Sequence, residues 1–293
     1  KNLGDVTLID VVEGMPQGKA LDLSQSSAVE GFTGKINGTN DFSQMKNSDV
    51  IIITAGLPRQ PGMSRDDLLE TNGKIIKKIA LDIKRHSPKA FVICITNPLD
   101  AMVYVLQKYS KLPKNMCVGM AGVLDSSRMK FFLSEALDVS INDVETFVLG
   151  GHGDDMVPLV NYTTIGGIPL MDYLKIKKIP VSKIQKIVDR TRMGGGEIVK
   201  LLKRGSAFYA PASSAIQMAE AYLFNQKKLL PCAAYLNGQY GLKSMYMGVP
   251  TIIGSKGIEK IIEVRLSASE KTMLKKSVKS VQGLVSAVEK ILK

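Results

Sequence analysis

The residues that could do chemistry centre on one histidine. The chain has only two histidines in 293 residues, and His152 lies in the segment Leu149-Gly150-Gly151-His152-Gly153-Asp154. A histidine in a core is often no more than a satisfied polar group, but flanking glycines allow the backbone to approach a ligand closely. A neutral imidazole can take a hydroxyl proton as hydride leaves, and can return it in reverse. With a carboxylate to orient it and arginines to hold an anion, His152 suits hydride transfer on a small dicarboxylic 2-hydroxy acid.

The carboxylate and one arginine occur upstream, as Asp125 and Arg128. Their i,i+3 spacing places them on one face of a helix. A surface ion pair is the ordinary explanation of such spacing. The apolar start of this segment, Gly119-Met120-Ala121-Gly122-Val123-Leu124, argues against an exposed helix. We therefore expect the pair to be buried near His152.

Two more arginines, Arg59 and Arg65, flank the sequence Gln60-Pro61-Gly62-Met63-Ser64. Proline and glycine at this density indicate a loop. Because a guanidinium binds a carboxylate bidentately, such a loop could close over an anion. The alternative, which the spacing does not exclude, is a solvated basic loop.

The first half of the chain alternates short apolar runs with helical periodicity. Strand patterns occur at 5–10, 49–56, 90–96 and 116–118, and helical patterns at 14–31, 66–85 and from Asn97-Pro98 onward. Runs that are apolar on both faces and alternate with helices are typical of a parallel sheet covered on both sides. Ligands bind such sheets at the carboxyl ends of the strands, where Asp10, Gly56 and Asn97 fall.

After Gly122 the pattern becomes mixed. We expect helices at 123–137, 182–203, 211–224 and 269–292, and strands at 145–150, 158–164, 230–236 and 245–253. The predicted fold is α/β: a Rossmann-type doubly wound parallel sheet with a second, mixed α+β substrate domain. We expect a cofactor-binding domain over residues 1–122 and a substrate domain over residues 123–293.

Composition excludes several classes. The sequence contains no uninterrupted stretch of about 18 apolar residues, so we expect no membrane span. No signal peptide is evident. The formal net charge is +12, but the lysines recur at helical spacings without interleaved aromatic residues, so we expect no nucleic-acid partner. The three cysteines have no metal-ligand spacing, so we expect no metal site, and they predict a reducing compartment. Cys94 and Cys117 lie in apolar runs, so we expect them to be buried thiols.

Taken in order, the motifs resemble the lactate/malate dehydrogenase family, nearest to its lactate-dehydrogenase-like bacterial malate dehydrogenases. The resemblance covers essentially the whole chain, and several ordered motifs together are far more specific than any one alone. The motifs are Thr54-Ala55-Gly56, Arg59 to Arg65, Ile95-Thr96-Asn97-Pro98, Gly122 to Arg128, Gly150 to Asp154, Gly194-Gly195-Gly196-Glu197 and Gly205 to Pro211.

The resemblance implies a role for each matching residue. His152 would accept and donate the proton, and Asp125 would orient it. Arg128 would bind the carboxylate common to all substrates, and Arg65 would polarise the reacting carbonyl. Asn97 would hold substrate and nicotinamide in place. The cofactor would be NAD, bound by Asp10, Thr54, Ala55, Gly56, Asn72 and Asn97.

Arg59 is the residue that the resemblance makes decisive for substrate choice. In this family an arginine here pairs with the second carboxylate of malate or oxaloacetate, whereas lactate-specific relatives usually carry an uncharged residue. A buried arginine that faces the methyl group of pyruvate would be left unpaired, which disfavours pyruvate. Some lineages changed substrate through the loop instead, so L-lactate dehydrogenase stays the alternative within the class.

The start of the chain departs from the family pattern. A first strand, a glycine-rich loop and its helix are expected before the segment that begins here, and G-x-G-x-x-G does not precede Asp10. Taken alone, Asp10 is more typical of a helix N-cap or turn residue than of a ribose ligand. We expect the chain to be a fragment, or its start to have been left out. The parent protein should be active, and we do not expect turnover from these residues alone.

A rival from another class is a non-catalytic basic binding protein on a truncated dinucleotide fold. The charge and the absent loop favour it, but it would not need His152, Asp125, Arg128, Arg65 and Asn97 together. By resemblance we expect a cytoplasmic enzyme of the tricarboxylic acid cycle. We expect a homotetramer, with a dimer possible, whose interface could include the helix at 14–31.

Overall fold

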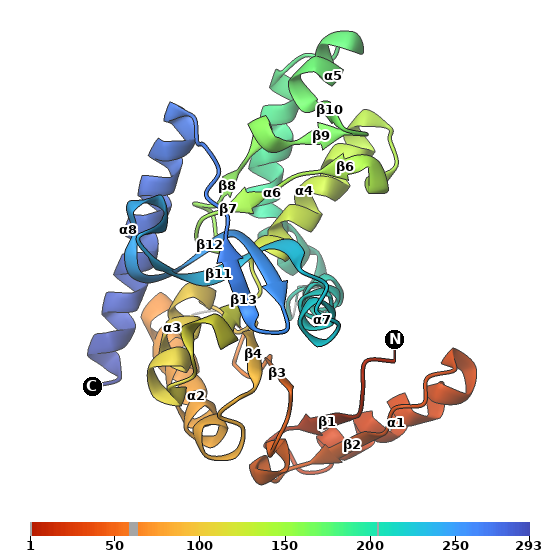
Figure 1. The fold of residues 1–293 in the computed structure, drawn as a ribbon, viewed down its shortest axis with the longest axis vertical. Helices are drawn as coiled ribbons and strands as arrows, with labels where there is room; N and C mark the ends of the chain where they lie inside the picture. The colour runs from red at the N-terminus through yellow and green to blue at the C-terminus, as the bar shows by residue number, and fades with distance from the viewer. Residues whose placement is uncertain (1, 59–63, 204) are drawn as a thin grey trace.

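The computed structural model describes residues 2–58, 64–203 and 205–293 (Figure 1). The first half contains β1 (Val6–Ile9), α1 (Met15–Glu30), β2 (Ile36–Thr39), β3 (Val50–Ile53), α2 (Arg65–His86), β4 (Phe91–Cys94), α3 (Leu99–Ser110) and β5 (Cys117–Gly119). The second half contains α4 (Gly122–Leu137), β6 (Val144–Glu145), β7 (Val148–Leu149), β8 (Val157–Pro158), β9 (Thr164–Ile165), β10 (Ile168–Pro169), α5 (Leu170–Ile176), α6 (Ser182–Leu202), α7 (Tyr209–Leu223), β11 (Lys228–Asn237), β12 (Lys243–Gly254), β13 (Gly257–Ile261) and α8 (Ala268–Ile291).

The expected parallel strands form two groups. β3, β4 and β5 pair in parallel, with Ile53 opposite Cys94 and Cys94 opposite Gly119. β1 and β2 form a separate two-stranded parallel sheet, which lies with α1 apart from the main body (Figure 1). The α/β fold with a parallel, Rossmann-like sheet is therefore confirmed.

The main sheet is mixed, which differs from the expected purely parallel arrangement. Its strand order is β13-β12-β11-β5-β4-β3, and β11 joins β5 antiparallel through Ala233 and Gly119. We expected β11 and β12 to belong to the second domain alone. Both strands are apolar on both faces, as their runs of buried residues show, so they fit the interior of a sheet covered on each side.

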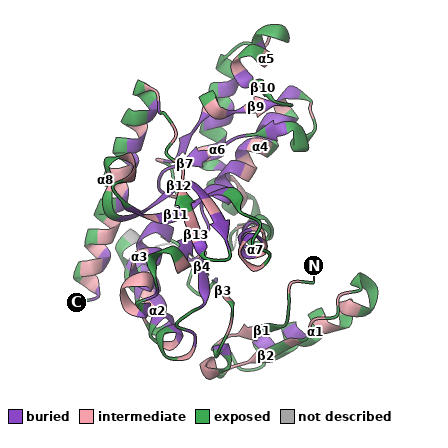
Figure 2. Cartoon of the chain, viewed as in Figure 1, coloured by how far each residue is buried: buried purple, intermediate pink, exposed green. Residues whose placement is uncertain are grey.

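Alternate residues of β4 show that helices cover both faces of the sheet. Val92 and Cys94 pack in the core that α2, α3 and the end of α8 share. Phe91 and Ile93 pack on the opposite face, in the cluster that contains Met218 of α7. Figure 2 shows the inner strands of this sheet, such as β4, β11 and β12, as mostly buried, whereas α1 is mostly exposed.

Local signals account for several element ends. Ser64 and Asp67 form a reciprocal capping box that begins α2. We expected Pro98 to lie in the first turn of α3, but the helix begins at Leu99 and Pro98 is its N-cap. The Asn97-Pro98 peptide bond is cis. β2 was missed because its residues, Ile-Asn-Gly-Thr, show no apolar alternation.

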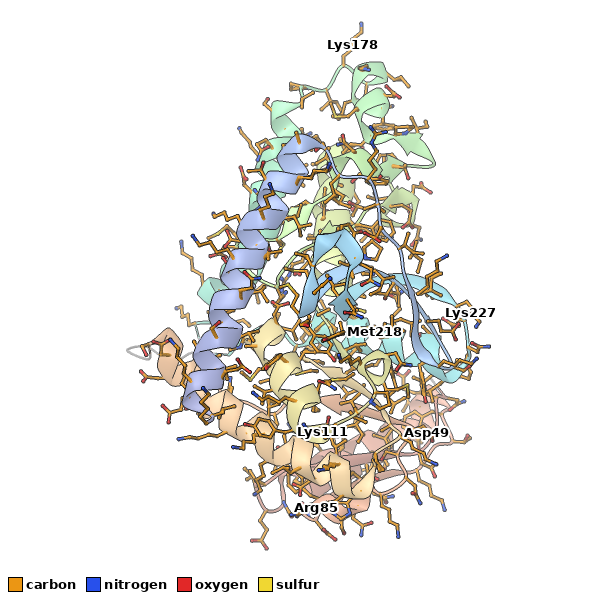
Figure 3. The ribbon with its side chains drawn as sticks, turned by 60° about the vertical axis from the view of Figure 1, so that its left-hand side comes forward. Asp49, Arg85, Lys111, Lys178, Met218 and Lys227 are labelled. Atoms are coloured by element: carbon orange, nitrogen blue, oxygen red, sulfur yellow. The ribbon has the colours of Figure 1, made fainter. Side chains whose placement is uncertain are left out.

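Basic side chains are dispersed over the molecule. In Figure 3 Lys178 lies at one end of the molecule, Arg85 at the opposite end and Lys227 at one side, while Met218 lies inside. In the part of the chain that the structure describes, no helix combines the length and apolar character needed to cross a membrane.

Candidate active site

The carboxyl ends of β3 and β4 lie side by side, as expected for parallel neighbours. The Thr96 hydroxyl donates to the Ala55 carbonyl over 2.7 Å and joins the two segments. A Cβ at Gly56 would lie only 2.6 Å from Thr96 Cγ2, so this close approach requires glycine. Thr54, Ala55 and Gly56 are exposed directly after a strand whose last residue is buried. Small exposed residues at this edge leave room for a flat ligand.

Asn72 connects the same two segments from α2. Its side chain accepts from the Leu57 N–H at 2.8 Å and donates to the carbonyls of Leu57 at 3.1 Å and Asn97 at 2.7 Å. Asn72 is 1% exposed, so these contacts satisfy its amide within the protein. Asn72 therefore fixes the backbone around Leu57 and Asn97, and the direct cofactor contact expected of its side chain stays a prediction. The side chain of Asn97 itself belongs to an exposed residue at this edge.

Asp10 lies directly after β1, where a carboxylate is expected. One of its oxygens, Oδ1, accepts the Val12 N–H over 2.9 Å, which is the turn contact considered as its alternative role. Asn40 donates to the Asp10 carbonyl and fixes the same turn. The half-buried carboxylate remains at the strand end, where an adenosine ribose binds in dinucleotide folds.

His152, Asp125 and Arg128 form a contiguous, largely buried group. His152 Nδ1 lies 2.9 Å from Asp125 Oδ2, and Arg128 Nη1 donates to Asp125 Oδ1 over 3.2 Å. The side chains of Asp125 and Arg128 are only 3% and 12% exposed, so this is not a surface ion pair. Because Asp125 occupies Nδ1, Nε2 is the nitrogen available to exchange a proton with a ligand. The expected triplet is thus brought together.

The charges around His152 favour its protonated form. Burial by itself disfavours the imidazolium, but the charge and hydrogen bond of Asp125, together with the charge of Asp100 in α3, raise the pKa of His152 above its usual value. Arg128 opposes this increase. An imidazolium beside Asp125 and Arg128 gives the trio a net positive charge, which suits an anionic ligand.

Arg128 also has an unsatisfied donor. Its Nε is buried and has no hydrogen-bond partner among the residues the structure describes. This nitrogen lies against Gly194 of α6, so it is covered by the protein itself. The terminal nitrogens of the guanidinium are the groups that can donate two parallel hydrogen bonds to a carboxylate.

Two side chains that the sequence analysis missed hold the backbone at His152. Asp100, in the first turn of α3, accepts the His152 N–H at Oδ2 over 2.9 Å. Ser277 of α8 accepts the neighbouring Gly151 N–H over 2.8 Å. A usable clue to Asp100 was a charge inside the otherwise apolar stretch 90–106. Ser277 had no comparable clue, because it lies far away in sequence.

We expected the glycines beside His152 to let the backbone approach a ligand, but packing within the protein explains two glycines of this region. A Cβ at Gly151 would lie 2.5 Å from Val281 Cγ2, whereas one at Gly153 would meet no described atom within 4 Å. Gly150 bridges to Gly248 of β12 through backbone hydrogen bonds in both directions. A Cβ at Gly248 would lie 2.4 Å from the Gly150 oxygen. Packing against β12 and α8 therefore requires Gly248 and Gly151, and Gly153 is free of that constraint.

Gly194 and Gly195 of α6 lie against Arg128. A Cβ at Gly194 would be 3.1 Å from Arg128 Cδ, and one at Gly195 would be 3.7 Å from the guanidinium nitrogens. Glycines in the middle of a helix are usually unfavourable. Here they let α6 pack directly on the arginine side chain.

Of the two loop arginines, the structure describes only the backbone of Arg65. Arg59 lies outside the described residues. Arg65 is the first residue of α2, and its side chain is likewise outside the described part. Both stay predictions from the sequence.

The chain matches two family profiles that together span almost its whole length. A family profile described as lactate/malate dehydrogenase, NAD binding domain, matches residues 1–119. A second, described as lactate/malate dehydrogenase, alpha/beta C-terminal domain, matches residues 122–292. A malate dehydrogenase of Methylobacterium radiotolerans is 58% identical over 287 residues, which cover 98% of this chain and 90% of the relative.

Solved structures agree with the sequence comparison. The malate dehydrogenase of Cryptosporidium parvum matches with a TM-score of 0.96 and 52% identity, over 98% of this chain and 91% of that chain. The lactate dehydrogenase of Cryptosporidium parvum, in complex with lactic acid and the cofactor nicotinamide adenine dinucleotide, matches with a TM-score of 0.95 and 46% identity, over the same shares.

Proposed function

Because the chain belongs to the lactate/malate dehydrogenase family, we propose that it is an NAD-dependent malate dehydrogenase, which interconverts (S)-malate and oxaloacetate. The observation that carries the proposal is the buried group of His152, Asp125 and Arg128, with its hydrogen bonds of 2.9 and 3.2 Å. A binding protein without catalysis has no use for a histidine with a raised pKa beside a partly paired arginine.

The cofactor NAD fits the edge of the sheet. Thr54, Ala55 and Gly56 leave space after β3, and Asp10 offers a carboxylate to the adenosine ribose. Asn72 fixes the backbone on either side of this edge. When bound, NADH supplies the hydride for C2 of oxaloacetate.

The side chains supply the proton and hold the substrate. His152 gives its Nε2 proton to the substrate oxygen in reduction and takes it back in oxidation. Asp125 keeps the imidazole in the required tautomer and stabilises its charged form. Arg128 binds the carboxylate next to the reacting carbon, Arg65 polarises the carbonyl, and Asn97 positions the substrate.

Substrate choice depends on Arg59 in this proposal. The fold itself does not discriminate, since malate and lactate dehydrogenase structures match with nearly equal TM-scores of 0.96 and 0.95. The second carboxylate of oxaloacetate would pair with Arg59, whereas the methyl group of pyruvate would leave it unpaired. Lactate dehydrogenase activity is therefore the second candidate, and it lacks this support.

NADH oxidation by the purified full-length protein tests the choice, with oxaloacetate and pyruvate compared at equal concentration. Wild type should prefer oxaloacetate. Arg59→Gln should reduce that preference about 10- to 150-fold, the value of one charge-assisted hydrogen bond. The matched control is Arg85→Gln, whose side chain is 73% exposed. Preference for pyruvate by wild type would overturn the role of Arg59, and no turnover with either substrate would overturn the proposed function.

The remaining parts of the proposal concern organisation and setting. We propose that residues 1–122 bind the cofactor and residues 123–293 the substrate, although β11 joins the two through the main sheet. The protein would act in the tricarboxylic acid cycle of the cytoplasm. Its three buried, free cysteines support a reducing compartment.

We also propose a homotetramer, with a dimer as the alternative. The support is the exposed apolar surface of α1, where Leu21 and Val29 are 62% and 86% exposed. Large exposed apolar side chains that gather on one element are typical of protein interfaces. Light scattering of the purified protein would measure the mass and decide between the two assemblies.

A further inference from the structure

A second carboxylate lies beside His152, in addition to that of Asp125. Asp100 is 2% exposed and belongs to the first turn of α3. Its Oδ2 accepts the His152 N–H over 2.9 Å. Its Oδ1 is buried and has no hydrogen-bond partner among the described residues. The carboxylate thus accepts a hydrogen bond from the backbone of the proton-transfer residue through one oxygen, while the other oxygen lacks a partner in the described part of the chain.

Helix capping does not account for Asp100. An acid near a helix N-terminus is favourable, but such acids are commonly exposed and solvated. Asp100 is buried instead, and burial raises its pKa to about 6. A buried carboxylate with one unsatisfied oxygen destabilises a fold. Its position beside His152 provides a functional reason for this arrangement.

Three charged groups surround the imidazole in the described part of the chain. Asp125 binds the ring from α4, where Arg128 is paired with it, and Asp100 binds the backbone of the same residue from α3; the charges of all three act on the imidazole. From α8 the contact to this loop is the uncharged Ser277, and the nearby Lys276 is paired with Asp155 at 2.8 Å. Asp100 therefore adds a second negative charge, which offsets the positive charge of Arg128.

We propose that Asp100 is a positioning residue of the enzyme. Its carboxylate fixes the backbone of His152, and its negative charge helps to keep the imidazole protonated before oxaloacetate is reduced. The role of Asp100 in oxaloacetate reduction rests on the proposed function. The link between the charge of Asp100 and the protonation of His152 can be measured without turnover.

The scarcity of histidine makes that measurement direct. The chain has only His86 and His152, so NMR of protein labelled at histidine Cε1 should give two ring resonances to follow with pH. Asp100→Asn keeps an oxygen that can accept the His152 N–H but removes the charge. We expect the pKa of His152 to fall by about 1 in this variant, the scale of a nearby charge in a partly buried site. The His86 resonance should be unchanged and serves as an internal control.

Kinetics complete the test. In Asp100→Asn, the pH at which oxaloacetate reduction declines should move down with the pKa of His152. Asp100→Ala, which also removes the acceptor, should lower kcat further than Asp100→Asn does. Asp172→Asn is the matched control, because its side chain is 57% exposed on α5.

The results separate this inference from the proposed function. An unchanged pKa of His152 in Asp100→Asn, in a protein whose NMR spectrum is otherwise native, would overturn the role of Asp100. Equal kcat values in the Ala and Asn variants would overturn the part played by the backbone contact. If the pKa of His152 falls in Asp100→Asn but the wild-type protein does not turn over oxaloacetate, only the malate dehydrogenase activity is refuted.

Discussion

Replacement of Asp125 by asparagine is the sharpest test of the catalytic group. Asp125 is 2% exposed and has two partners, His152 Nδ1 at 2.9 Å and Arg128 Nη1 at 3.2 Å. An asparagine side chain has nearly the same shape and can still accept one hydrogen bond. The substitution therefore removes the negative charge from beside His152 while it leaves the packing of α4 intact.

The expected loss follows from the charge that is removed. Opposite charges about 4 Å apart interact by about 4 kcal/mol at an effective dielectric constant of about 20. Arg128 shares the carboxylate, so the imidazolium of His152 loses only part of this interaction. We expect kcat for oxaloacetate reduction to fall about 10²- to 10³-fold, which corresponds to about 2.7–4 kcal/mol.

The pH dependence should change in a defined direction. Oxaloacetate reduction needs protonated His152, so its rate declines as pH rises through the pKa of His152, which Asp125 raises in wild type. In Asp125→Asn this decline should occur at lower pH. Malate oxidation needs the neutral imidazole, so its rate should increase with pH through the same pKa.

The assay is NADH absorbance at saturating substrate over a range of pH, with thermal unfolding as a check of the fold. Asp189→Asn is the matched control, because Asp189 and Arg192 form the same i,i+3 pair at 3.3 Å with a 59% exposed aspartate. It should change kcat by no more than about fivefold, since surface pairs contribute about 0–1 kcal/mol. A kcat within about tenfold of wild type for Asp125→Asn, well below the Coulomb estimate, would refute the electrostatic role.

Two further substitutions test how the site is supported. Gly194→Val should lower the free energy of unfolding by about 1–3 kcal/mol, the usual cost of overpacking, and should lower kcat/KM for oxaloacetate, because a Cβ there would lie 3.1 Å from Arg128 Cδ and displace the guanidinium. Gly196→Val is its control in the same helix, since a Cβ there meets no described atom within 4 Å, and equal kinetics of the two variants would contradict the role of Gly194. Asn72→Ala removes three hydrogen bonds and should lower the free energy of unfolding in urea by about 2–4 kcal/mol and raise the KM for NADH. Asn115→Ala removes one exposed side-chain hydrogen bond and should cost about 1 kcal/mol, so equal losses in the two asparagine variants would show that Asn72 has no special supporting role.

Much of the fold could be read from apolar patterning. The expected helix at 66–85 is observed at Arg65–His86, and the expected strand at 90–96 at Phe91–Cys94. Periodicity predicts such elements because burial on one or both faces determines where apolar residues must fall. Pairing between distant strands leaves no such trace, which is why the contact between β5 and β11 was not anticipated.

The site was predictable to a similar extent. His152, Asp125 and Arg128 were expected to meet, and their distances confirm it. Asp100 was missed, although its charge interrupts the apolar stretch 90–106 and its carboxylate accepts the His152 N–H. The glycines of α6 were identified as part of a family motif, but nothing in the sequence explained them. Their close packing against Arg128 provides that reason.

From the sequence we could predict which residues would carry the proposed chemistry, because imidazole, carboxylate and guanidinium groups occur in it as ordered motifs. The alternation of strands and helices was also predictable, since it follows from local apolar periodicity. The additional carboxylate of Asp100 beside His152, the burial of Arg128 and the reason for glycine in α6 became clear only from the folded structure. These properties depend on contacts between segments far apart in the chain, as between Gly151 and Ser277. Burial and electrostatic coupling arise from such contacts, so local sequence does not encode them in a readable form.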